Sequence, residues 1–193
     1  MAMLAALALA GCAGGLGGLI TPTPPPAFDL AAAGSFPHHA RQPRGQLVIA
    51  EPIALAALDG DRIVVRPRPG ETAALSGAQW EDRLPKLVQA RLLQSFENAN
   101  WLRRVGLPAD RIASDYVLVS ELRAFDISVA DHSAVVEIAV KIVRQSSGRI
   151  MTARVFRASV PALSTTGPAA VAALNDAFAQ VAKQIVLWAA RVV

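Results

Sequence analysis

The stretch from residue 115 to residue 160 constrains the fold of this chain more than any other segment. It contains three successive apolar runs with turn-like joins at Asp131-His132-Ser133 and Ser146-Ser147-Gly148. The runs cover residues 115–129, 133–145 and 148–160. In the middle run, apolar residues from Val136 to Ile142 alternate with Glu137, Ala139 and Lys141, which is typical of a half-buried strand. We expect an antiparallel three-stranded meander, with bulges or partial burial of both faces in the two outer strands, where the alternation is weaker.

Two segments have the periodicity of amphipathic helices. In residues 84–102, Leu84, Val88, Leu92 and Phe96 recur every four residues, with Leu87 beside them, and Pro85 suits a first turn. Residues 165–193 carry a longer stripe at steps of three and four residues. That stripe consists of Val171, Leu174, Phe178, Val181, Ile185 and Trp188. Because flanking charges are sparse, we expect this helix to pack on a sheet rather than in a coiled coil.

Two shorter strands are expected before the first helix. Residues 47–50 form an apolar run that Pro52 stops, and residues 62–66 form a second run after a turn at Asp59-Gly60. They form either a hairpin or a strand pair separated by a longer loop. The expected order is β-β-α-β-β-β-α. It predicts an α+β fold with a mostly antiparallel sheet and two amphipathic helices packed on one face.

Composition narrows the class of protein. The chain of 20.3 kDa suits one domain plus a tail, and its 53% hydrophobic residues suffice for a core. The formal charge is +4, but the arginines are spread along the chain and aromatic residues make up only 5%. A nucleic-acid-binding surface needs a basic stripe with interleaved aromatics, so we expect no nucleic-acid partner.

The sequence contains none of the common catalytic motifs. There is no GxSxG, no GxxxxGK[ST] phosphate loop and no HExxH. The three histidines are His38 and His39 in a proline-flanked loop and His132 in a turn, which is a poor arrangement for a metal site. A hydrolase needs a nucleophile with a base within reach, and histidines in two loops make that class improbable. We expect no enzyme activity, cofactor or metal.

Other conspicuous polar residues are interpreted as structural. Asp59 and Asp61 lie in a turn before a strand, without the oxygen ligands of a calcium loop. Glu81 and Asp82 precede a helix, where negative charge complements the helix dipole. Trp80 is expected in the core, with a position at the lip of a site as the alternative.

Cys12 is the single cysteine, and so it cannot form an internal disulfide. The apolar residues 1–10 are too few to span a bilayer, which needs about 20, but they fit the apolar region of a secretory signal. Leu9-Ala10-Gly11-Cys12 resembles a bacterial lipobox, in which the cysteine is the lipidation site. The alternative is an incidental or buried cysteine. No basic residue precedes the apolar run, so we expect the natural start to lie upstream.

The chain therefore divides into three parts. Residues 1–11 are expected to be a lipoprotein signal peptide, and residues 12–27 the lipidated Cys12 with a Gly/Pro-rich tether. Glycines make such a tether flexible, and the proline run makes it extended. Residues 28–193 form the expected folded domain.

Taken in order, these segments resemble the ABC-type transport auxiliary lipoproteins, the PqiC-like family. The resemblance is carried by the lipobox, by "FDL" at residues 28–30, by "LDGDRIVVRP" leading to "QWEDRLP", and by the three strand segments and the last helix. It extends over nearly all of residues 28–190. In lipoproteins of this kind, Ala13 after the cysteine resembles an outer-membrane address.

The resemblance implies a non-enzymatic lipoprotein, acylated with palmitate-type chains and facing the periplasm of a Gram-negative bacterium. Its implied partners are an ABC permease, its ATPase and a membrane-anchored MCE protein of the MlaD or PqiB type. Such systems move lipids, mainly phospholipids, between the inner and outer membranes. Exposed apolar residues would mark the docking surface or a self-association surface, so a homo-oligomer stays open, and Arg66 and Arg68 are candidate surface groups. The alternative is a scaffold lipoprotein of another envelope transport or secretion machine.

Overall fold

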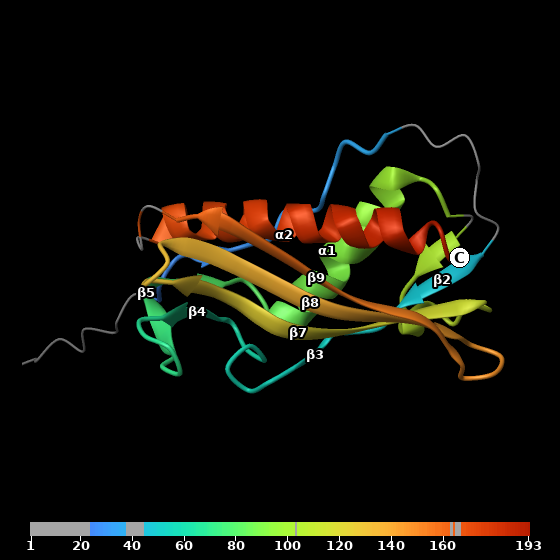
Figure 1. The fold of residues 1–193 in the computed structure, drawn as a ribbon, viewed down its shortest axis with the longest axis horizontal. Helices are drawn as coiled ribbons and strands as arrows, with labels where there is room; N and C mark the ends of the chain where they lie inside the picture. The colour runs from blue at the N-terminus through green and yellow to red at the C-terminus, as the bar shows by residue number, and fades with distance from the viewer. Residues whose placement is uncertain (1–23, 38–44, 103, 163, 165–166) are drawn as a thin grey trace, which may run out of the picture.

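The computed structural model describes residues 24–37, 45–102, 104–162, 164 and 167–193. Two α-helices and nine strands form an α+β domain in which both helices lie on one side of a curled, mixed sheet (Figure 1). The strands are β1 (Ala27–Phe28), β2 (Gln46–Ile49), β3 (Ile53–Ala54), β4 (Arg62–Arg66), β5 (Ala73–Trp80), β6 (Arg104–Gly106), β7 (Tyr116–Ser128), β8 (Ser133–Arg144) and β9 (Ile150–Pro161). The helices are α1 (Leu84–Ala99) and α2 (Gly167–Ala189), with a short 3-10 turn at Pro108–Asp110.

The predicted meander is confirmed. Strands β7, β8 and β9 pair antiparallel along almost their whole lengths. The irregularities expected in the two outer strands are also present, because the register shifts leave one extra residue in β7, Arg123, and one in β9, Met151. Side chains of β8 that face the helices, such as Ile138 and Ile142, are fully buried.

The predicted pairing of the first two strands is wrong. Strands β2 and β4 do not pair with each other; each pairs parallel with β7, and the two-residue strand β3 does so between them. The cause is the length of β7, whose 13 residues let one continuous segment of chain run alongside it in three short stretches. The sheet is therefore mixed, and the prediction of a mostly antiparallel sheet is wrong.

Strand β5 was absent from the expected order, as were the short strands β1, β3 and β6. Residues 73–80 read Ala-Ala-Leu-Ser-Gly-Ala-Gln-Trp, and these mostly small side chains give no clear apolar alternation. The strand forms because it pairs antiparallel with β4 and parallel with β1. At its end, Trp80 is only 1% exposed, which confirms the prediction of a core position.

Both predicted helices are confirmed. Helix α1 buries the whole expected stripe, and Pro85 lies in its first turn. Helix α2 buries its stripe from Val171 to Ile185 against β8 and β9, as expected for a helix that packs on a sheet. At the centre of the core, the Phe125 ring lies 5.8 Å from the Trp80 ring and 6.0 Å from the Phe178 ring.

Candidate functional site

Two charged sequence motifs meet in space where α1 begins. "LDGDR" provides Asp59, Gly60 and Asp61, and "QWEDRLP" provides the residues that enter the helix. The Trp80 N–H donates to the Asp61 carbonyl at 2.6 Å, and the Leu84 N–H donates to the Gly60 carbonyl at 2.9 Å. Main-chain hydrogen bonds therefore join the β3–β4 loop to the start of α1.

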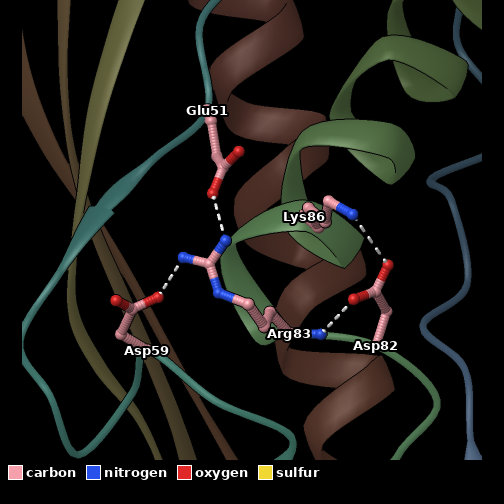
Figure 2. Close-up of polar contacts among 5 residues, drawn as sticks. All are labelled: Glu51, Asp59, Asp82, Arg83 and Lys86. Atoms are coloured by element: carbon pink, nitrogen blue, oxygen red, sulfur yellow. Dashed lines mark hydrogen bonds and ion pairs between the residues drawn. The ribbon is translucent and has the colours of Figure 1, made fainter.

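Arg83 is the centre of an ion-pair cluster at this junction (Figure 2). Its guanidinium donates to the Asp59 carboxylate and, at 3.1 Å, to the Glu51 carboxylate. The hydrogen bond and charge of Asp59, followed by the charge of Glu51, hold the pKa of Arg83 above its ordinary value. We call Glu51, Asp59, Asp82, Arg83 and Lys86 the Arg83 cluster.

Asp82 belongs to the same cluster. Its carboxylate accepts the Arg83 main-chain N–H at 2.7 Å and lies 3.5 Å from the Lys86 ammonium. The backbone hydrogen bond and the nearby positive charges of Lys86 and Arg83 hold its pKa below the ordinary value. The expectation that Asp82 serves helix entry fits this geometry, because the carboxylate lies just before the first turn. All of these groups are at least partly exposed and engaged with one another, which is the pattern of a structural junction.

A second polar arrangement holds the start of the domain on the helices. Residues 28–33, which we call the N-terminal strap, run over α1 and α2. Asn175 of α2 accepts the Ala31 N–H at 2.7 Å and donates to the Asp29 carbonyl at 3.4 Å. Arg91 of α1 pairs with the Asp29 carboxylate.

The far end of the strap is held by α1. The buried Ser95 hydroxyl accepts the Ala33 N–H at 2.9 Å, and the Asn98 side chain donates to the Ala33 carbonyl at 3.0 Å. Leu30 and Ala33 are each 2% exposed. Just before the strap, the Pro26 carbonyl accepts the Gln79 N–H of β5 at 3.2 Å. Residues 26–33 are thereby held from the β1–β5 end of the sheet to α1.

The remaining predicted site residues are distributed as follows. Cys12, Ala13, His38 and His39 lie outside the described residues, so lipidation of Cys12 stays a prediction. His132 lies in the turn between β7 and β8, where its main-chain N–H donates to Val129 and its carbonyl accepts from Ala162. Arg66 pairs with buried Asp126 at 2.8 Å, and exposed Arg68 pairs with Glu71 at 3.3 Å.

In the part of the chain that the structure describes, no three His, Cys, Asp or Glu side chains are grouped so that they could hold a metal ion. Of the described helices, neither has the length and apolar character needed to cross a membrane.

The contacts that form the strap and the Arg83 cluster could not be predicted from the sequence. In the sequence Asp29 stands out only as part of "FDL", and its partners lie 62 and 146 residues away along the chain. Sequence spacing carries no information on such pairs, so only the motifs themselves were detectable.

The fold and these contacts define a two-helix α+β domain whose N-terminal strap is held against both helices. The family model for the ABC-type transport auxiliary lipoprotein component matches residues 28–186. The chain therefore belongs to this family, as the sequence motifs predicted.

Individual relatives agree with this assignment. The chain is 32% identical over 162 residues to the uncharacterised protein bll6063 of Bradyrhizobium diazoefficiens. That match covers 83% of this chain but 44% of the relative, so the chain spans less than half of that protein's length. The crystal structure of XCC0632 from Xanthomonas campestris, assigned to the family DUF330, superposes with a TM-score of 0.79 at 28% identity, covering 86% of this chain and 96% of that one.

A more distant structure shares the fold alone. The hypothetical protein CT253 of Chlamydia trachomatis is 9% identical and superposes with a TM-score of 0.55, covering 78% of this chain and 98% of that one.

Proposed function

We propose that this protein is a non-enzymatic, lipid-anchored subunit of an ABC transport system that contains an MCE protein and moves lipids, chiefly phospholipids, between the two membranes of a Gram-negative envelope. Family membership over residues 28–186 supports the transport role. The anchor is Cys12, and Ala13 directs the protein to the outer membrane, with the folded domain facing the periplasm.

The observation that carries this proposal is the strap. A tether can set the orientation of a domain at the membrane only if the chain is fixed where it enters the domain. Here four side chains of α1 and α2, with β5, hold residues 26–33. A protein that carries two or more acyl groups is stably anchored in a membrane, since a single acyl group binds only marginally. The domain would thus be held from its β1–β5 end, with the opposite end directed away from the membrane.

The function of the domain would be docking. The chain contains no phosphate loop, so the ATPase subunit supplies the energy. The alternative is that the protein is a scaffold lipoprotein of another envelope machine. The identity of the partner that it captures distinguishes the two functions.

The test compares the wild type with Cys12→Ala in the native host, by membrane fractionation, intact-mass spectrometry and affinity capture. We expect an acylated wild type in the outer-membrane fraction that captures an MCE protein, and a variant that leaves the membrane fraction but stays folded. A lipidated protein that captures another machine would establish the scaffold function instead. An unmodified, membrane-free wild type would refute the anchor.

A further inference from the structure

Strand β9 has one free edge. Within the described part of the chain it pairs with β8 alone, through eleven of its twelve residues. The Ala162 N–H donates to the His132 carbonyl, and Pro161, which has no N–H, lies opposite Ser133. Hydrogen-bonded and non-hydrogen-bonded pairs alternate from this point, which places Val155 in a non-bonded pair with Ala139. The main-chain groups of Val155, and of Ala153 and Arg157 on either side, therefore point away from β8.

The same strand exposes large apolar side chains. Ile150, Met151 and Val155 are 53%, 36% and 45% exposed. The register aligns Val155 with Ala139, Glu121 and Ile53 across the sheet, and Ile53 is 65% exposed. These residues share the sheet face opposite the helices, since Ile138 and Val140, the neighbours of Ala139, are buried toward them. Exposed Glu121 separates Val155 from Ile53 on this face, so the apolar group that marks an interaction site is the one on β9 itself.

The charge around this edge is predominantly positive. Residues 133–161 contain five basic residues, Lys141, Arg144, Arg149, Arg154 and Arg157, against the single acidic residue Glu137. Glu137 is already paired with Arg157 at 2.8 Å. The other four form no ion pair with any described residue. The Arg154 guanidinium lies 5.3 Å from the centre of the Phe156 ring, which holds it in place while leaving its N–H groups for a carboxylate.

A second copy of this chain is a poor occupant of the edge. Two β9 edges placed together would bring arginines against arginines, and like charges on paired strands are destabilising. Among the other described strands, β1, β3 and β6 each pair with a single neighbour, and β5 is covered by β1 only at Gln79 and Trp80. None of these four strands contains an acidic residue.

We propose that the free edge of β9 accepts an extended, acidic segment of a partner protein as an added antiparallel or parallel strand. Its acidic side chains would lie on the α2 side, against Arg154, and its apolar side chains on the opposite side, against Val155. Main-chain hydrogen bonds provide affinity in this mode of recognition, and the alternating side chains provide specificity. The inference rests on the proposed function only for the identity of the partner, which would be the MCE component.

The test uses the purified full-length chain and a fluorescein-labelled peptide of alternating valine and glutamate, measured by fluorescence anisotropy. One comparison peptide replaces glutamate by lysine, and another carries N-methyl groups on the residues of one edge. We expect the acidic peptide to bind at least about tenfold more tightly than the basic one, and N-methylation to abolish binding. Equal binding of the N-methylated peptide, or no binding of the acidic peptide, would overturn the proposal.

Variants locate the site. Arg154→Glu should weaken acidic-peptide binding by at least about tenfold, whereas Arg62→Glu, an exposed arginine on β4, should not change it. Val155→Pro should abolish binding, because it removes an outward N–H without removing a bond to β8, and its circular dichroism spectrum should match the wild type. Self-association of the wild type that Arg154→Glu abolishes, without peptide binding, would identify a second copy as the occupant and refute the proposal.

Capture of the MCE protein separates this inference from the proposed function. If Arg154→Glu captures the MCE protein as well as the wild type does, the edge is not the docking site and the proposed function stands. If the wild type binds the acidic peptide but captures no MCE protein, the edge inference stands and the proposed transport partner is wrong.

Discussion

Ser95→Ala tests whether the strap is part of the folded domain or only rests on it. Ser95 is 0% exposed, and its hydroxyl donates to the Arg91 carbonyl at 2.6 Å while it accepts the Ala33 N–H at 2.9 Å. Without the hydroxyl, the Arg91 carbonyl still accepts its main-chain hydrogen bond within the helix. The Ala33 N–H, in contrast, loses its acceptor inside the protein.

The expected cost follows from that buried donor. Leaving a buried N–H unsatisfied costs about 1–3 kcal/mol. At about 2 kcal/mol, a chain of this size should lose roughly 4–8 °C in its thermal midpoint. If the strap detaches alone, the loss appears as local opening, because Leu30 and Ala33 are released before the sheet unfolds.

Thermal unfolding by circular dichroism measures the global effect, and hydrogen exchange of residues 28–33 measures the local one. Ser76→Ala, at an exposed position on β5, is the matched control. We expect Ser95→Ala to lower the midpoint or to speed exchange in the strap, and Ser76→Ala to do neither. Identical behaviour of the two variants would refute the argument that Ser95 holds the strap.

Two further predictions concern the Arg83 cluster and the core. Asp82→Asn should have a lower free energy of unfolding than the wild type at neutral pH. The difference should shrink below about pH 3.8, the ordinary pKa, and vanish once the pH falls through the lowered pKa that the Asp82 carboxylate has in the folded state. Urea unfolding at a series of pH values measures this difference, and a difference that does not change with pH would contradict the prediction. Phe125→Ala should lower the free energy of unfolding by about 3–5 kcal/mol, because the ring is 1% exposed and contacts Trp80 and Phe178. Phe28→Ala, at a partly buried position, is the comparison, and urea unfolding should show the larger loss of stability for Phe125→Ala.

Local periodicity was enough to locate the helices and the long strands. The stripes of α1 and α2 and the alternation in β8 arise from burial of one face, and burial leaves a mark on neighbouring positions of the sequence. Strand β4 was predicted at its observed bounds, Arg62–Arg66, because it contains a short apolar run bounded by a turn and a proline.

Pairing was not predictable by the same means. The direction in which β2 and β4 run relative to β7 depends on where the intervening residues lie, and no local pattern reports that. The candidate sites show the same limit, because the Arg83 cluster joins residues up to 32 positions apart and the strap contacts join residues up to 146 positions apart. The motifs were visible in the sequence, but their partners were not.

The length of β7 connects the fold to the proposed docking edge. Because β2, β3 and β4 occupy one edge of β7 in succession, β8 must cover the other, and β9 becomes the outermost strand on that side. Helix α2 then covers one face of β9 and leaves the opposite face and the free edge open. Proteins usually protect such an edge with charge, and here every charge on β9 is an arginine. The same arginines that prevent pairing between two copies would favour an acidic strand, so protection against self-association and selection of a partner would follow from one set of residues.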